Sequence, residues 1–104
     1  MKADFGLQER DLLAIRSILE KYPEVKQAFI FGSRAKGNYK PGSDVDIALK
    51  GEYLTLQTAS HVAYELNEET NMPYQFDVLN YHSIQEPALT RHIDRAGICI
   101  YEKK

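Results

Sequence analysis

The sequence contains a single cysteine, Cys99. One thiol can form neither a disulfide within the chain nor a zinc site built from several thiolates, so both of these stabilising devices are excluded. Because its neighbours Ile98 and Ile100 are apolar, we expect Cys99 to be a buried structural thiol rather than a reactive one.

The sequence also lacks an excess of either charge and any long apolar run. Its formal net charge is -2, and 27% of its residues are charged. This composition is typical of a globular domain and predicts no basic surface for direct nucleic-acid binding. No stretch is long enough to span a membrane, and the N-terminal segment MKADFGLQER lacks the apolar core of a signal peptide. We therefore expect a cytoplasmic protein without membrane association.

The chain has 104 residues, which is room for one core, so we expect a single domain over residues 1–104. Helical and strand periodicities alternate along it, which predicts an α/β or α+β domain of about four strands. The predicted elements, in chain order, are a helix over 12–22 ended by Pro23, a strand over 28–31 that is apolar on both faces, a strand over 44–49, a helix over 56–66, a strand over 76–79, a helix over 86–96 and a strand over 98–101.

Two carboxylates interrupt the second predicted strand. Asp44 and Asp46 are two residues apart, so in an extended chain they share a face at a separation of about 6.7 Å. Two anions held in this way raise each other's pKa unless a cation lies between them. The pair predicts a metal site, and the alternative is the solvated face of an edge strand.

A third carboxylate, Asp77, emerges from the third predicted strand between Phe76 and Val78. If its strand neighbours that of Asp46, about 4.8 Å away, three carboxylates converge on one patch of the sheet. Ligands that are all oxygens favour Mg²⁺ or Mn²⁺, and two such ions can clamp both oxygens of a phosphoryl displacement. The alternative for Asp77 alone is an ordinary surface pair with a lysine.

Gly32 and Ser33 follow the first predicted strand and precede a possible short helix that begins with Arg34. Glycine lets a polyphosphate approach the backbone, and Ser33 with the first free N–H groups can donate hydrogen bonds to it. Arg34 and Lys36 could add positive charge, although such residues are more often solvated. Taken without the acidic pair, Gly32-Ser33 would be only a turn.

Other metal and phosphate motifs do not fit the sequence. An EF-hand beginning at Asp44 would need an oxygen ligand at Ala48 and a glycine at Leu49. A Walker-type P-loop fails because Lys36 precedes Gly37 and no serine or threonine follows it. The three histidines show no metal-ligand spacing, and we expect them on helix surfaces or in loops.

The spacing of Gly32-Ser33, ten residues and then Asp44-Val45-Asp46 resembles the signature of the DNA polymerase beta type nucleotidyltransferases. The fuller stretch GSRAKGNYKPGSDVDIAL resembles most closely the minimal nucleotidyltransferases. These are small bacterial and archaeal antitoxins encoded beside a HEPN-domain toxin. The resemblance implies the nucleotidyltransferase fold, a small mixed sheet flanked by helices.

The resemblance also implies a site and a reaction. Asp44, Asp46 and Asp77 would bind two Mg²⁺ ions, with Mn²⁺ possible, and Asp77 would favour deprotonation of the acceptor. The residues implied to hold the triphosphate of ATP are Gly32 and Ser33, with Arg34 and Ser43 as further candidates. AMP would pass to a tyrosine of a HEPN ribonuclease in a heteromeric complex, which would make the protein the antitoxin of a type VII toxin–antitoxin pair.

Two other functions stay open at this point. The protein could neutralise its HEPN partner by binding alone, with an idle site, or it could modify a small molecule. Larger relatives add a domain that holds the nucleobase and the acceptor, and this chain has no room for one. We therefore expect the partner to supply the missing walls, which also counts against a small-molecule acceptor.

Overall fold

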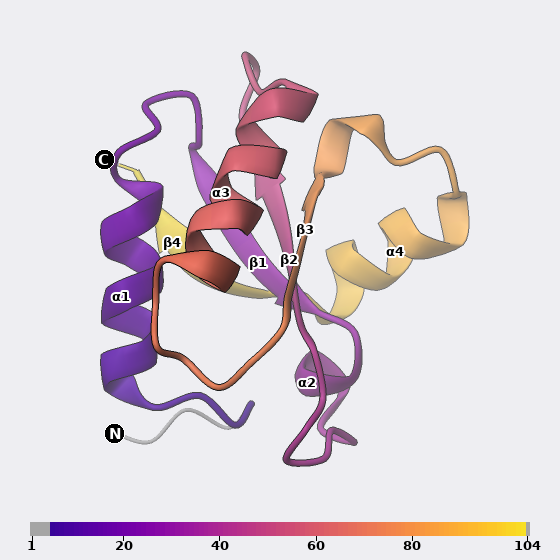
Figure 1. Cartoon of the computed structure of the whole chain (residues 1–104). Helices are drawn as coiled ribbons and strands as arrows, with labels where there is room; N and C mark the ends of the chain where they lie inside the picture. Colours follow the sequence, from indigo (N-terminus) through magenta and orange to yellow (C-terminus); the bar gives the residue numbers. More distant parts are fainter. Residues whose placement is uncertain (1–4, 104) are drawn as a thin grey trace.

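The computed structural model of the protein describes residues 5–103. Its elements, in chain order, are α1 (Glu9–Leu19), β1 (Gln27–Phe31), α2 (Ser33–Lys36), β2 (Val45–Lys50), α3 (Leu56–Glu68), β3 (Phe76–Asn80), the 3₁₀ turn η1 (Tyr81–Ser83), α4 (Pro87–Ala96) and β4 (Ile98–Glu102) (Figure 1). All four predicted strands and the three predicted long helices are present. The predicted α/β class is confirmed.

The strands form one mixed sheet in the order β3-β2-β1-β4. β1 pairs antiparallel with both β2 and β4, whereas β2 and β3 are parallel. Parallel neighbours need a long crossover connection, and α3 supplies it between β2 and β3 (Figure 1). Because β2 is a central strand, the edge-strand interpretation of its two carboxylates is wrong.

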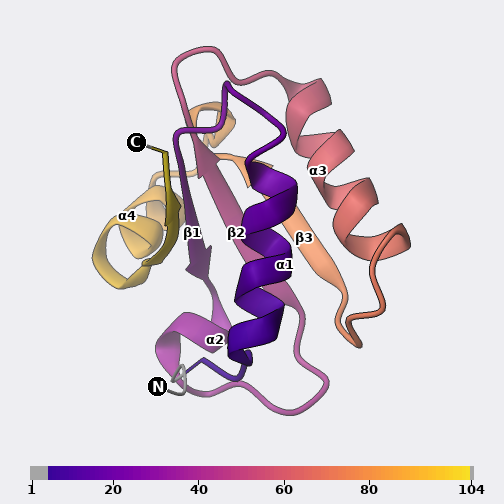
Figure 2. The ribbon, with the colours of Figure 1, turned by 90° about the vertical axis from the view of Figure 1, so that its left-hand side faces the viewer.

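Helices cover the two faces of the sheet unequally. Figure 2 shows α1 and α3 on one side and α4 on the other. The main core lies under α1 and α3, and a smaller cluster around Phe31, Ala48 and Ile93 lies under α4. Among residues 5–103, no helix has the length and apolar character needed to cross a membrane.

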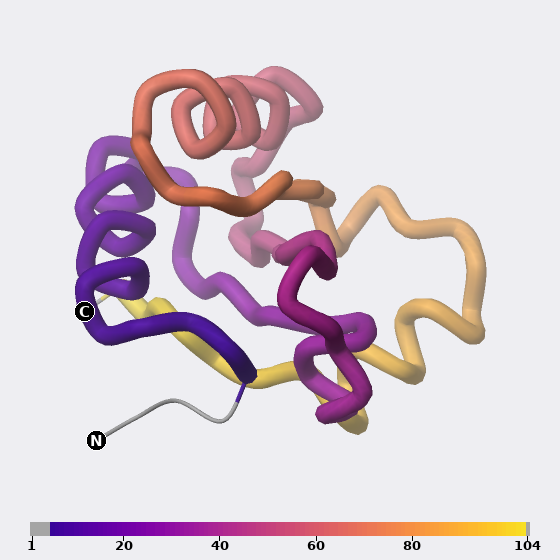
Figure 3. The backbone as a smooth tube through the Cα atoms, turned by 60° about the horizontal axis from the view of Figure 1, so that its bottom comes forward, coloured from indigo at the N-terminus to yellow at the C-terminus, as the bar shows by residue number. Residues whose placement is uncertain are grey.

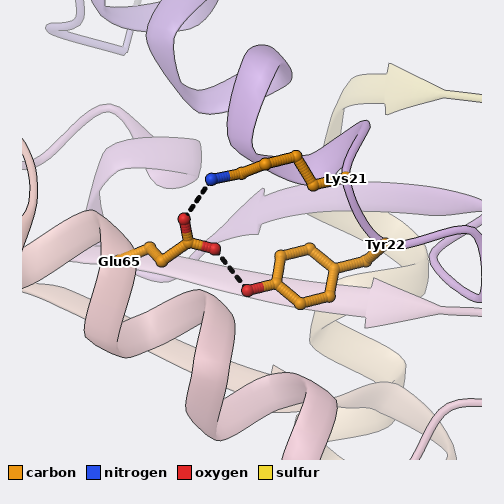
Figure 4. Close-up of polar contacts among 3 residues, drawn as sticks. All are labelled: Lys21, Tyr22 and Glu65. Carbon is orange, nitrogen blue, oxygen red and sulfur yellow. Dashed lines mark hydrogen bonds and ion pairs between the residues drawn. The ribbon is translucent and has the colours of Figure 1, made fainter.

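The first helix ends earlier than its periodicity predicts. α1 stops at Leu19, and the N–H groups of Lys21 and Tyr22 bond three residues back, to Ile18 and Leu19. These tight turns bring the two side chains onto Glu65 of α3, where Lys21 and Tyr22 each bond one carboxylate oxygen (Figure 4). Lys21 first and Tyr22 second lower the pKa of Glu65. The contact ties α1 to α3.

The prediction that Cys99 is buried is wrong, because its side chain is exposed. Side chains alternate across a strand, so Cys99 faces away from its neighbour Ile100, which is buried in the main core. The apolar neighbours that suggested burial therefore pack on the opposite face of an edge strand.

Candidate active site

The carboxyl end of β1 brings a glycine against an acidic side chain. Gly32 directly follows β1 and has a φ of 77°, a left-handed conformation that favours glycine. A Cβ atom added to Gly32 would lie 2.3 Å from Oδ2 of Asp46. The register explains this approach, since Phe31 of β1 pairs with Asp46 of β2. Only a residue without a side chain fits here.

The structure also brings together carboxylates that are remote in sequence. Asp46 on β2 and Asp77 on β3 are register partners in the parallel pair, and Asp44 lies one residue before β2. Burial, then Asp77 and then Asp44 raise the pKa of Asp46, while Arg34 opposes the rise. The three carboxylates therefore act on one another electrostatically, with Asp46 half-buried between two exposed neighbours.

The side chains as they stand do not form a closed metal cage. Within residues 5–103 there is no group of three His, Cys, Asp or Glu that could hold an ion. The chemistry of the donor set nevertheless fits a hard cation, because Asp44, Asp46 and Asp77 offer only carboxylate oxygens. Asp44 and Asp77 are exposed, and exposed side chains exchange rotamers within nanoseconds, so the donors can adjust without movement of the sheet.

Arg34 has a different environment from the solvated one that its residue type favours. Its side chain is only 2% exposed, and its guanidinium donates to the carbonyls of Phe5 (3.0 Å), Ser43 (2.8 Å) and Asp44 (3.3 Å). Arg34 therefore joins the short helix α2 to the backbone that carries the first acidic residue. Figure 3 shows this part of the chain doubling back between α2 and β2.

The two candidate serines lie on either side of this loop. Ser33 is the first residue of α2, where the first N–H groups of a helix have no intrahelical acceptor. The Oγ atom of Ser43 accepts a hydrogen bond from the N–H of Lys40 (2.8 Å), and its carbonyl accepts from Arg34. In this conformation Ser43 holds the loop together.

Sequence reasoning missed a histidine at the site. Nε2 of His92, on α4, accepts a hydrogen bond from the N–H of Gly32 at 2.8 Å, and its ring meets Phe31 edge-on at 6.2 Å. The sequence predicted a helix over 86–96 that contains this histidine. No local pattern could show that His92 faces the end of β1.

A groove of about 520 Å³ adjoins the acidic cluster. It lies beside β3, between α3 and the segment that leads into α4, and Asp77 is one of its polar walls. Its main apolar walls are Leu56, Ala59, Ala63, Val78, Ile84 and Leu89. A carboxylate at the edge of an apolar groove can meet a polar group at the end of an apolar ligand.

A glycine-serine turn, an acidic strand and a neighbouring strand carboxylate are thus assembled on one sheet, and a family model described as polymerase beta nucleotidyltransferase matches residues 14–104. The chain belongs to the polymerase beta nucleotidyltransferase family. The match includes every candidate residue discussed above. The protein is a nucleotidyltransferase, as its motif predicted.

Two curated proteins are similar to the chain. It is 27% identical over 102 residues to the probable protein adenylyltransferase MntA of Haemophilus influenzae, which covers 98% of this chain and 89% of that protein. It is 38% identical over 73 residues to a putative protein adenylyltransferase of Methanocaldococcus jannaschii, which covers 69% of this chain and 76% of that protein.

Solved structures of toxin–antitoxin complexes share its fold. A toxin–antitoxin crystal structure with AMP-PNP superposes with a TM-score of 0.72 at 19% identity, covering 94% of this chain and 76% of the other. The MNT antitoxin bound to the tri-AMPylated HEPN toxin of Shewanella oneidensis gives a TM-score of 0.70 at 18% identity, covering 93% and 74%. The predicted nucleotidyltransferase fold with its mixed sheet is confirmed.

Proposed function

We propose that this protein, as one domain over residues 1–104, transfers AMP from ATP to a tyrosine of a HEPN ribonuclease toxin in the cytoplasm. It would thereby act as the antitoxin of a type VII pair. Three findings support the proposal: the family, the relatives named as protein adenylyltransferases, and the toxin–antitoxin complexes that share the fold. The observation that carries it is the contact of Gly32 with Asp46 beside Asp77.

That contact matters because it places the proposed phosphate-binding turn and the carboxylates at one point of the sheet. Because Gly32 has no side chain, the Asp46 carboxylate lies directly against the turn that leads into Ser33, whose N–H begins a helical turn. The acidic strand begins directly across the register from that turn. A triphosphate held by the turn therefore lies next to the carboxylates.

The proposed reaction is an in-line displacement at the α-phosphorus of ATP. Asp77 accepts the proton of the tyrosine hydroxyl, whose oxygen forms the new bond to the α-phosphorus. The bond from that phosphorus to the bridging oxygen breaks, and pyrophosphate leaves. The groove beside Asp77 provides apolar walls for the part of the acceptor that carries the hydroxyl.

Asp44, Asp46 and Asp77 would hold the divalent ions, Mg²⁺ or Mn²⁺, which supply charge stabilisation for the transferred phosphoryl group. The raised pKa of Asp46 supports this role, because a cation relieves the repulsion among the three carboxylates. The protein's own contribution is to fix these oxygens beside the phosphate-binding turn.

Labelling of the HEPN partner tests the proposal. The protein is incubated with a candidate HEPN-domain toxin, Mg²⁺ and ATP radiolabelled at the α-phosphate. We expect Asp46→Asn to lose at least about 100-fold of the labelling rate, since metal stabilisation is worth several kcal/mol. Asp94→Asn is the matched control, because Asp94 is an exposed residue on α4 that accepts a hydrogen bond from Tyr81.

The same variants separate catalysis from neutralisation by binding. If the toxin's ribonuclease activity is suppressed equally by the wild type and by Asp46→Asn, with or without ATP, the protein acts by occlusion and the proposal is wrong. Intact mass spectrometry of the partner reports whether AMP units are added, and substitution of the labelled tyrosine identifies the acceptor.

A further inference from the structure

We infer that His92 is a positioning residue for the phosphate-binding turn, because its side chain anchors the backbone N–H of Gly32. This inference rests on the proposed function, which assigns the triphosphate to the turn at Gly32 and Ser33. It adds a residue that lies outside the glycine-serine and double-aspartate signature. It also specifies which atoms of the turn can contact the nucleotide.

The anchor is a hydrogen bond across the molecule. Gly32 N–H donates to Nε2 of His92 at 2.8 Å, and the two residues are 60 positions apart. Since Nε2 is the acceptor, it carries no proton, and Nδ1 of a neutral imidazole carries it instead. The edge-on contact with Phe31, at 6.2 Å between ring centroids, holds the ring against the end of β1.

Gly32, whose N–H is anchored by His92, is also restricted in the space beside its Cα. Its φ of 77° turns the chain out of the strand, and Asp46 occupies the space where a side chain would be. His92 and Asp46 therefore restrain Gly32 through its N–H and its Cα respectively. A shift of this residue moves the turn relative to the carboxylates.

The hydrogen bond also determines which N–H groups of the turn remain as donors for a phosphate. Because the N–H of Gly32 is used by His92, it is not directed at the nucleotide. The N–H groups left for the phosphates begin with Ser33, at the first turn of α2. Gly32 contributes the direction of the turn and its close contact with Asp46, whereas Ser33 would contribute the hydrogen bonds to phosphate.

A second histidine provides an internal control. Nε2 of His82, in η1, accepts a hydrogen bond from the N–H of Gly51 at 3.1 Å. Gly51 follows β2, so this anchor is the same kind of bond at the opposite end of that strand from Asp46. The loss of stability on substitution of His82 measures what such a bond contributes to stability alone.

The experiment compares His92→Gln with His92→Asn. Both variants carry the same amide, but only the glutamine oxygen extends as far as Nε2 does. His92→Phe, which keeps the ring contact with Phe31 and lacks an acceptor, is the third variant, and His82→Asn is the control. Initial rates of AMP transfer to the HEPN partner are measured against ATP concentration at saturating partner.

We expect His92→Asn and His92→Phe to lose about 10- to 100-fold in kcat/KM for ATP, mainly through KM, as expected for a partly buried N–H left without its acceptor. His92→Gln should recover to within about fivefold of the wild type, given the cost of a more flexible side chain. His82→Asn should change KM for ATP by less than about twofold, since its effect is on stability.

Amide hydrogen exchange of Gly32 provides a readout that needs no activity. The N–H of Gly32 should be protected in the wild type and in His92→Gln, and should exchange faster in His92→Asn. If the wild type transfers no AMP, the proposed function fails, while this measurement still tests the anchor. An unchanged KM for ATP in His92→Asn, an equal rise in His82→Asn, or no rescue by glutamine would overturn the inference.

Discussion

At the scale of single residues, Gly32 shows how one backbone position can be restricted by several neighbours. Its conformation favours glycine, and the space beside its Cα is filled by the Asp46 carboxylate. Gly37 has a similar φ of 85° but has no neighbouring atom within 4 Å of an added Cβ. A comparison of substitutions at the two glycines therefore separates the effect of backbone strain from the effect of contact with the acidic site.

We predict that Gly32→Ala destabilises the fold by about 1 to 2 kcal/mol, because of the left-handed backbone. The larger effect is on AMP transfer, which should fall by about 100-fold as Asp46 is displaced. Gly37→Ala should cost about 1 kcal/mol of stability with transfer within about twofold of the wild type. Denaturant unfolding and transfer rates measure the two effects, and equal activity losses in both variants would contradict the contact argument.

Asp46 has a raised pKa because it is partly desolvated and lies near Asp77 and Asp44. A carboxyl whose pKa is higher in the folded state adds stability that is fully present below its unfolded pKa of about 3.9. That stability is lost as the pH rises through the higher folded value. Above that folded value, the ionised Asp46 therefore opposes folding of the metal-free protein.

We predict that Asp77→Asn lowers the pKa of Asp46 in the metal-free protein, because it removes the largest electrostatic cause of the rise. It should also make stability less dependent on pH above about pH 4. Carbon-13 NMR titration of the Asp46 carboxyl measures the change, with Asp94→Asn as the control. A pKa that stays the same in Asp77→Asn would show that Asp77 does not contribute to the shift.

At the scale of elements, Arg34 connects α2 to the loop before β2. Its guanidinium bonds three backbone carbonyls and lies over the rings of Tyr39 and Tyr74, 5.2 Å from each centroid. Through the carbonyls of Ser43 and Asp44 it fixes the loop at the point where the acidic strand begins. We infer that Arg34 positions Asp44 rather than serving as a free surface charge.

We predict that Arg34→Met destabilises the protein by about 2 to 3 kcal/mol, because three carbonyls lose a charged donor. It should also increase amide exchange over residues 37–44 and reduce AMP transfer. Lys36→Met, an exposed position on the same short helix, should stay within about 0.5 kcal/mol of the wild type. Equal stability of the two variants would show that the loop does not depend on Arg34.

The elements themselves were predictable to a large extent from the sequence. Local apolar periodicity indicated the four strands and the three long helices, and the spacing of Gly32 and Asp46 indicated the family. The convergence of Asp46 and Asp77 was predicted only on the condition that their strands are neighbours, because strand order depends on contacts between distant segments. The structure shows these as register partners.

The surroundings of Arg34 and His92 could not be predicted for a related reason. Both side chains bond backbone groups, and a backbone group has no identity in the sequence. Cys99 was misplaced because its neighbours in sequence lie on the other face of β4. Residue type was informative for chemistry that side chains perform, and less so for side chains that support the backbone.

At the scale of the whole molecule, the sheet carries the acidic cluster on strands that the main core holds from the other side. Val45 and Ile47, which flank Asp46, are fully buried in that core. The core therefore holds the strands that bear the carboxylates in place. In the absence of a cation, the mutual repulsion of these carboxylates lowers the stability of the fold. A bound divalent ion should therefore stabilise the entire fold.

We predict that Mg²⁺ at about ten times its Kd adds about 1.4 kcal/mol of stability, which corresponds to a rise in Tm of about 6 to 11 °C for a domain of this size. Asp46→Asn should show no such rise. Thermal unfolding with MgCl₂, compared with NaCl of equal ionic strength, measures the effect. An equal rise in wild type and variant would assign it to general screening of charge.

The bond between Gly32 and His92 has a consequence for synthesis of the chain. His92 follows Gly32 by 60 residues, and β4 follows α4, so both are translated after the glycine-serine turn. A nascent chain can thus contain the complete glycine-serine and double-aspartate motif while the turn is not yet held in place. The turn gains its anchor only once α4 has been made and has packed against the end of β1.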